Sequence, residues 1–141
     1  MVDDVLINKA ASIERCIMRV REEYLADPES FADNHTRQDA AILNIQRACE
    51  AALDMGQHLL RREKLGIPQS ARDVFSLLAQ ANWIETTLAD SLKRMIGFRN
   101  IAVHDYQSLQ MPITLNIITQ HLDEFLLYSA TIIKKDANIS Q

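Results

Sequence analysis

The chain of 141 residues has few of the residues that interrupt helices, with only three glycines and three prolines. Its two cysteines, Cys16 and Cys49, stand in neither a CxxC nor a CxxH spacing, so nothing indicates a zinc site or a disulfide framework. No apolar run approaches the length of a membrane span, and the start MVDDVLINKAAS is acidic where a signal peptide is basic. We therefore expect a helix-rich cytoplasmic protein with reduced thiols and no membrane partner.

The chain also has fewer basic than acidic residues. Fifteen lysines and arginines stand against 19 aspartates and glutamates, which gives a formal net charge of −4 and a pI of about 5.5. Binding to nucleic acid without sequence preference depends mainly on neutralised phosphates, so DNA is not an expected partner and any RNA site must be a local cluster of cations. The 48% hydrophobic content is that of a folded chain, and the length suits one domain over residues 1–141.

Apolar residues recur at helical spacing in five segments. The first covers residues 3–26, a second follows residue 36, a short one follows residue 70, and a fourth runs from about residue 84 into the segment 97–106. The last begins near Pro112 and ends in the polar tail KKDANISQ. No segment alternates with a period of two. We predict an all-α, up-and-down bundle of four long helices plus one short helix.

Three sequence patterns predict where helices begin. Each has a polar residue followed three positions later by an acidic one, which is typical of a helix N-terminus. The residue pairs are Thr36 with Asp39, Ser70 with Asp73, and Asn82 with Glu85.

The stretch GFRNIAVHDY places Arg99, His104 and Tyr106 at the spacing RxxxxHxY. On a continuous helix Arg99 and Tyr106 share a face, while His104 points about 140° away from Arg99. A straight helix in one chain would not bring all three side chains together. Either the helix ends or distorts near Val103, or a second copy of the chain completes a site, and both can hold. The alternative is that these are ordinary surface residues near a helix end.

This stretch resembles the RxxxxHxY signature of HEPN domains, and more closely that of the HepT toxins, whose partner is a minimal nucleotidyltransferase antitoxin. The segment LGIPQSARDVFSLLAQANWI is similar to the short-helix segment that those toxins place before the motif helix, and the order of five helices agrees. The resemblance covers most of the chain. It implies a metal-independent endoribonuclease without a cofactor, acting on RNA as a homodimer whose two motifs face one cleft.

The chemistry of RNA cleavage suits the motif residues. Attack by the 2′-hydroxyl needs proton carriers and a cation beside the phosphate, roles that fit His104 and Arg99 as catalytic residues. Asn100 and Asp105 are candidate supporting residues, with a helix cap and a solvated carboxylate as their respective alternatives. In the toxins that this chain resembles, the motif tyrosine receives adenylate groups from ATP, which makes Tyr106 the expected modification site. The added bulk and negative charge would keep RNA out of the cleft.

Two further pairs at helical spacing, Asp54 with His58 and His121 with Glu124, raise the possibility of a metal inside the bundle. The ExxH pairs of a di-iron bundle are missing from the sequence, so we expect exposed polar side chains and no metal. The main alternative to an enzyme is a non-catalytic HEPN-like helical dimer that binds a nucleotidyltransferase or a nucleotide. The complete RxxxxHxY motif favours the enzyme.

Overall fold

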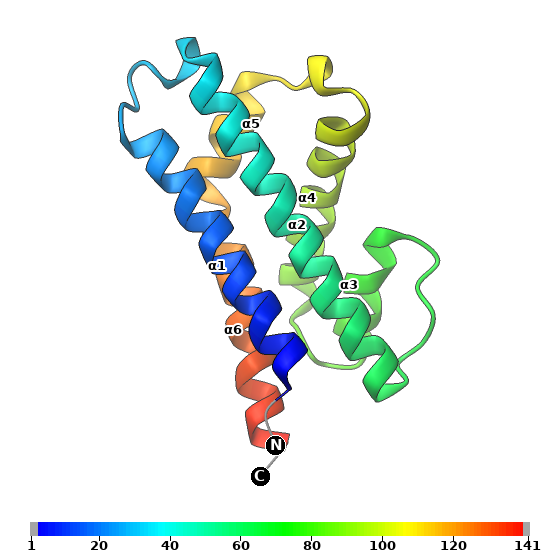
Figure 1. Cartoon of the computed structure of the whole chain (residues 1–141). Helices are drawn as coiled ribbons and strands as arrows, with labels where there is room; N and C mark the ends of the chain where they lie inside the picture. Colours follow the sequence, from blue (N-terminus) through cyan, green and yellow to red (C-terminus); the bar gives the residue numbers. More distant parts are fainter. Residues whose placement is uncertain (1–2, 140–141) are drawn as a thin grey trace.

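The structure, a computed structural model, describes residues 3–139 as six α-helices and two short 3₁₀-helices, with no β-strand in that range. None of these helices is both long and apolar enough to span a membrane. The all-α prediction is confirmed. The elements are α1 (Asp4–Leu25), η1 (Phe31–Asp33), α2 (His35–Glu63), α3 (Ala71–Gln80), α4 (Thr86–His104), η2 (Tyr106–Ser108), α5 (Met111–Gln120) and α6 (Leu122–Ile139), shown in Figure 1.

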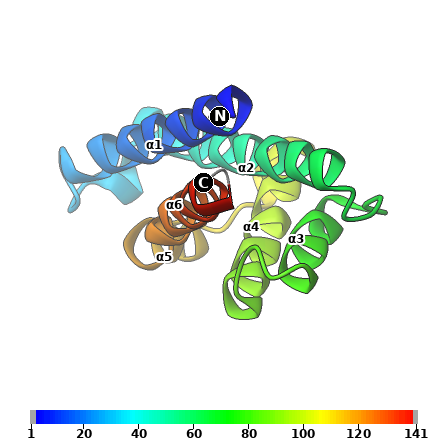
Figure 2. The same ribbon diagram turned by 90° about the horizontal axis from the view of Figure 1, so that it is seen from below.

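The helices form two layers. The longest two, α1 and α2, run antiparallel and side by side (Figure 1). Seen from the end in Figure 2, α5 and α6 pack under α1, while α3 and α4 pack under α2. Contacts between α4 and α6 close the core beneath the first layer. The motif helix α4 is therefore positioned by its contacts with α3, α2 and α6.

The α1 helix follows the prediction closely. Asp3 is its N-cap, and the Asp3 carboxylate accepts hydrogen bonds from the backbone N–H groups of Val5 and Leu6 at 3.0 and 3.2 Å. Such a cap satisfies donors that have no partner within the helix. The predicted apolar stripe is buried at Leu6, Ala10, Ile13, Ile17 and Val20.

The start of α2 differs from the prediction. Asn34 is the N-cap, and its side-chain oxygen accepts a hydrogen bond from the backbone N–H of Arg37 at 3.1 Å. Asn34 takes this role because it follows the η1 turn with extended backbone (φ −108°, ψ 93°), the conformation that an N-cap needs. The predicted capping box of Thr36 and Asp39 is therefore wrong, since both residues lie inside the helix. Asp39 projects from the helix surface and is exposed.

The predicted cap of α4 is also wrong, whereas that of α3 is confirmed. Glu85 precedes α4 without a capping hydrogen bond from its side chain, and Asn82 occupies a left-handed turn with φ 63°. The helix begins two residues later than predicted because the chain uses that turn to leave α3. In α3, the Ser70 hydroxyl accepts a hydrogen bond from the Asp73 N–H at 3.2 Å, as the pattern predicts.

The single helix predicted after Pro112 is two helices. His121 (φ −124°, ψ −3°) separates α5 from α6, although its backbone N–H still donates to the Ile117 carbonyl at 2.9 Å. Apolar spacing did not reveal this break because a single non-helical residue hardly disturbs the helical rhythm on either side. The α6 helix also extends to Ile139 and so includes most of the predicted tail, whose last residues, 140 and 141, lie outside the described range.

Candidate functional site

The motif helix α4 ends at His104. Asp105 makes the last helical backbone hydrogen bond and then leaves the helical conformation (φ −152°, ψ 58°), after which Tyr106 begins the η2 turn. This confirms the prediction that the helix ends near Val103. The shared face that a continuous helix would give to Arg99 and Tyr106 therefore does not exist. The end of the helix also leaves His104 exposed.

Arg99 lies against α2. Its Nη1 is 3.4 Å from the Glu50 Oε1, its side chain is 17% exposed, and its Nε is buried without a hydrogen-bond partner among the described residues. A buried donor without a partner costs about 1–3 kcal/mol, so such groups are uncommon in folded proteins. A guanidinium has five N–H donors in a planar fork. The ion pair with Glu50 fixes Arg99 in place and leaves donors for a phosphate.

Tyr106 also contacts α2, through Asp39. The Tyr106 hydroxyl donates a hydrogen bond to the Asp39 Oδ1. Burial of the hydroxyl, with the hydrogen bond and the negative charge of Asp39, raises the pKa of Tyr106 to about 12. The side chain is nevertheless 43% exposed, and it borders two surface hollows of about 270 and 390 Å³. The hydroxyl is therefore neutral near pH 7 and lies beside open space.

Asp39 and Glu50 lie on one stripe of α2. Eleven residues at 100° per residue return to within about 20° of the starting direction, roughly 16 Å further along the helix. One end of this stripe holds the Tyr106 hydroxyl, and the other end holds the Arg99 guanidinium. Within one chain these two functional groups therefore bind α2 at separate points and do not converge.

The two supporting residues have different surroundings. Asn100 is half-buried on α4. The Asp105 carboxylate accepts a hydrogen bond from the Ser108 hydroxyl at 2.5 Å, and its backbone carbonyl accepts one from the Ser108 N–H at 2.9 Å. These bonds close the η2 turn, which fixes the backbone between His104 and Tyr106. Supporting roles for both residues stay predictions.

Sequence reasoning missed Asp39 and Glu50 as members of the site. Asp39 already had an explanation as part of a helix cap, and nothing near Glu50 relates it to the motif. The one signal in the sequence is that both acidic residues share a helical phase on α2. The shared phase of Asp39 and Glu50 can be interpreted only when the structure shows that this side of α2 contacts the motif segment.

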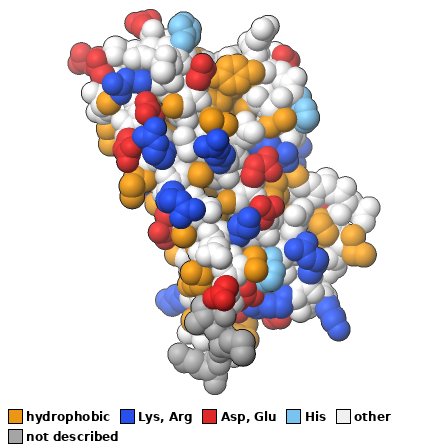
Figure 3. All heavy atoms as spheres, in the orientation of Figure 1, with side chains coloured by type: hydrophobic (Ala, Val, Ile, Leu, Met, Phe, Trp, Pro, Cys, Tyr) orange, Lys and Arg blue, Asp and Glu red, His pale blue; other side chains and the backbone are white. Residues whose placement is uncertain are grey.

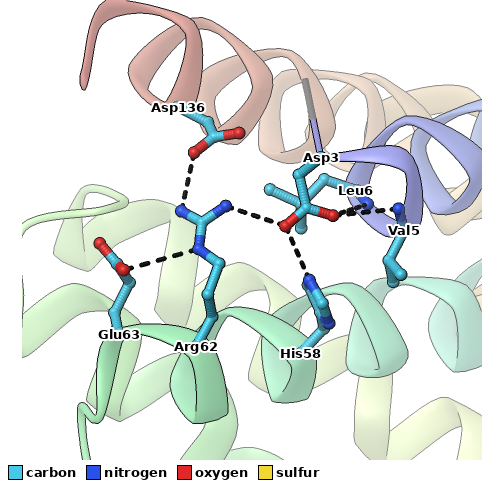
Figure 4. A network of polar contacts seen from close by, with 7 residues as sticks. All are labelled: Asp3, Val5, Leu6, His58, Arg62, Glu63 and Asp136. Carbon is cyan, nitrogen blue, oxygen red and sulfur yellow. Dashed lines mark hydrogen bonds and ion pairs between the residues drawn. The ribbon is translucent and has the colours of Figure 1, made fainter. Parts of the chain in front are cut away.

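Of the two pairs considered for a metal, Asp54 and His58 bind other residues, while His121 and Glu124 bind each other. The His58 Nε2 is 2.8 Å from the Asp3 Oδ2, and Arg62 binds Asp3 at 2.9 Å and Asp136 at 2.7 Å, as Figure 4 shows. This network joins the start of α1 to α2 and α6. Asp54 pairs with a lysine of α1, and His121 pairs with Glu124 on its own segment. Over residues 3–139, no group of three His, Cys, Asp or Glu side chains could hold a metal ion.

Charges are mixed on the face formed by α1 and α2. Figure 3 shows basic and acidic side chains interspersed over it. Arg19 pairs with Glu22 and Glu23 of its own helix, and Arg21 pairs with Asp123. The described part of this face therefore has no continuous basic track.

A family model described as ribonuclease HepT-like matches residues 13–132 of the chain. The chain belongs to the HepT-like ribonuclease family. The matched range includes the whole RxxxxHxY motif and both acidic residues of α2 that bind it. The HepT-like chain is also 50% identical over 124 residues to the mRNA nuclease HepT of Shewanella oneidensis. The aligned region covers 88% of this chain and 92% of that protein.

Two solved structures are similar to the HepT-like chain in both sequence and fold. One is a tri-AMPylated HEPN toxin of Shewanella oneidensis in complex with an MNT antitoxin, with a TM-score of 0.88, 48% identity, and coverage of 93% of this chain and 98% of that one. The other is a toxin–antitoxin structure with AMP-PNP, with a TM-score of 0.88, 48% identity, and coverage of 92% and 98%. These similarities confirm the family that the motif indicated.

Proposed function

We propose that this HepT-like chain is a metal-independent endoribonuclease and the toxin of a toxin–antitoxin pair, with an RxxxxHxY site shared by two protomers. The observation that carries the proposal is the end of α4, which leaves His104 exposed while Arg99 stays half-buried on the same helix. The 50% identity to a protein named mRNA nuclease HepT supports the same activity.

The proposed reaction is attack of an RNA 2′-hydroxyl on the adjacent phosphorus. The bond from O2′ to phosphorus forms, the bond from phosphorus to O5′ breaks, one proton leaves the 2′-hydroxyl, and one is delivered to the departing oxygen. His104 is the proton carrier because an imidazole ring can both accept and donate a proton through its nitrogens. The Arg99 fork binds the phosphate oxygens as negative charge develops on them. One histidine does not fill both proton positions, so a second copy supplies the other.

The last turn of α4 exposes two apolar side chains. Ile101 and Val103, both within that turn, are 40% and 43% exposed. Two positions apart on a helix, they point about 160° away from each other and do not form one patch, so the second copy is inferred from the missing proton carrier. Light scattering at micromolar concentration should give about 32 kDa, twice the chain mass of 16.1 kDa. A monomer would contradict the shared site.

The proposed partner is a nucleotidyltransferase antitoxin that transfers adenylate from ATP to Tyr106. The similar toxin of Shewanella oneidensis is tri-AMPylated and in complex with an MNT antitoxin, which supports this mode of control. The neutral hydroxyl of Tyr106, on a residue that is 43% exposed, suits an acceptor. A phosphodiester at this position adds negative charge close to His104, so RNA is repelled and cleavage stops.

The test is cleavage of total cellular RNA in EDTA by the purified chain and three variants of verified fold. Arg99→Ala and His104→Ala should lose cleavage. Arg94→Ala should retain it, because this exposed arginine of the same helix binds only Ser91 among the described side chains. Equal cleavage by all four proteins would indicate contamination. No cleavage by any of them, with an unmodified intact mass, would favour the non-catalytic binding protein.

A further inference from the structure

The hydrogen bond between Tyr106 and Asp39 joins residues 67 positions apart, from η2 and α2. Asp39 has no ion-pair partner within residues 3–139, so no lysine or arginine occupies its carboxylate. The side chain is exposed and forms part of the wall of both hollows beside Tyr106. The Asp39 carboxylate, which has no ion pair within the described residues, thus accepts a hydrogen bond from the Tyr106 hydroxyl. This hydroxyl is the one that the proposed function assigns as the adenylate acceptor.

Adenylate transfer to a tyrosine requires removal of the hydroxyl proton. Because the pKa of Tyr106 is about 12, only about one molecule in 10⁵ is phenolate at pH 7. The proton therefore leaves while the oxygen attacks phosphorus, and a general base must lie within hydrogen-bond reach at that moment. Asp39 already accepts that proton in a hydrogen bond.

We propose that Asp39 is the general base for adenylylation of Tyr106, so that the toxin itself supplies a catalytic group for its own silencing. The inference rests on the proposed function, in which Tyr106 is the modified residue. The Tyr106 oxygen attacks the α-phosphorus of ATP, the bond to the β-phosphate oxygen breaks, and pyrophosphate leaves. The proton passes from Tyr106 to Asp39. Because both groups belong to one chain, the base enters the active site of the nucleotidyltransferase together with the nucleophile.

The surroundings of the pair suit this step. The hollows of about 270 and 390 Å³ that both Tyr106 and Asp39 line leave room for the phosphate that the hydroxyl attacks. Apart from Asp39, Tyr106 and His35, the polar side chains that line these hollows are uncharged. His35 precedes Asp39 by one helical turn. His35 is thus the second titratable group whose replacement, as His35→Gln, must be checked in any pH profile.

The experiment follows transfer by intact mass, with the full chain, its nucleotidyltransferase and ATP with magnesium. Asp39→Asn is the informative variant because the amide oxygen of asparagine still accepts the Tyr106 hydrogen bond but does not take a proton near pH 7. We expect its kcat for modification to fall about 100-fold or more, with little change in KM. The matched control is Asp54→Asn, an exposed aspartate of the same helix that pairs with Lys9, and it should react at the wild-type rate.

The pH profile separates a base from a residue that only orients the tyrosine. Between about pH 7 and 9 the wild-type rate should change little, whereas the Asp39→Asn rate should rise roughly tenfold per pH unit as phenolate forms. Asp39→Glu should restore part of the rate. A wild-type rate in Asp39→Asn, or a loss of the same factor at every pH, would overturn the inference.

The proposed function fails in a different way, so the two outcomes are distinguishable. If the wild-type chain gains no mass, or if Tyr106→Phe is still modified, the assignment of Tyr106 as the acceptor is wrong and the role of Asp39 falls with it. If the wild-type chain is modified at Tyr106 and only Asp39→Asn behaves unexpectedly, the function stands and the base assignment alone is wrong.

Discussion

The Arg99 guanidinium lies 3.4 Å from a carboxylate oxygen of Glu50, and the two side chains differ in exposure, at 17% and 46%. Solvent weakens an ion pair of this kind, so its contribution to folding stability is small. Its effect is geometric, because it holds the arginine of α4 against α2. The N–H donors of Arg99 that Glu50 does not bind stay available for a phosphate.

Arg99→Lys tests whether the planar fork is required or only a positive charge. Lysine keeps the positive charge, but its ammonium group is a compact point charge that lacks the planar pair of N–H donors of a guanidinium. We expect RNA cleavage to fall by about tenfold or more, since bidentate contacts to phosphate are lost. The measurement is the initial rate on a labelled RNA, with Arg94→Lys on the same helix as the control. Wild-type rates for Arg99→Lys would show that charge alone is sufficient.

Asp3→Asn should lower stability in a pH-dependent way. Burial raises the pKa of Asp3, but hydrogen bonds from His58, the Leu6 N–H and Arg62 together bring it to about 2, below the ordinary 3.8. The folded state thus binds the proton more weakly than the unfolded state. The stabilisation is present above about pH 3.8 and is lost as the pH falls through 2. We expect a loss of about 1–2 kcal/mol at pH 7.

Urea denaturation of wild type and Asp3→Asn at several pH values measures this effect. The difference in free energy of unfolding should shrink as the pH is lowered toward 2. Asp4→Asn is the neighbouring control, because Asp4 is exposed in the first turn of α1 and should change stability by less than about 0.5 kcal/mol. A difference between wild type and Asp3→Asn that stays constant with pH would argue against the charged network.

Tyr128 should make the protein sensitive to alkali. It is fully buried, its hydroxyl donates to the Ala52 carbonyl at 2.8 Å, and burial raises its pKa far above the ordinary value. The folded state keeps this proton where the unfolded state loses it, so stability is complete below about pH 10 and falls as the pH rises further. In Tyr128→Phe the decline in unfolding free energy above about pH 10 should be shallower. Parallel declines in the two proteins would contradict this assignment.

Two glycines offer a matched pair of alanine substitutions. A Cβ on Gly56 would lie 2.6 Å from the Val74 Cγ1 and 2.9 Å from the Tyr128 hydroxyl oxygen, inside the core. Gly56→Ala should therefore destabilise the fold by about 1–3 kcal/mol. A Cβ on Gly97 would meet only the tip of Arg72, at 3.1 Å. Gly97→Ala should be neutral or stabilising by up to about 1 kcal/mol, since alanine favours helix. Equal effects in urea denaturation would be the contrary result.

The apolar spacing predicted the helices well, and their boundaries less well. The stripe of α1 is buried as expected because helical phase alone decides which side chains share a face. The predicted N-cap of α2 was wrong because Asn34 and Thr36, two positions apart, are both suitable cap residues. The conformation of the η1 turn before Asn34 determines that Asn34 is the cap. The break at His121 depends on one residue, which leaves the apolar rhythm on both sides intact.

The sequence by itself determined that the chain is all-α and that Arg99, His104 and Tyr106 form one motif, because both conclusions depend on residues a few positions apart. Only the tertiary structure decided that Asp39 binds Tyr106 and that Glu50 binds Arg99. These contacts join α2 to residues far along the chain, so they depend on how two helices pack and on the phase of each. Local spacing carries no information about either quantity until the helices are placed side by side.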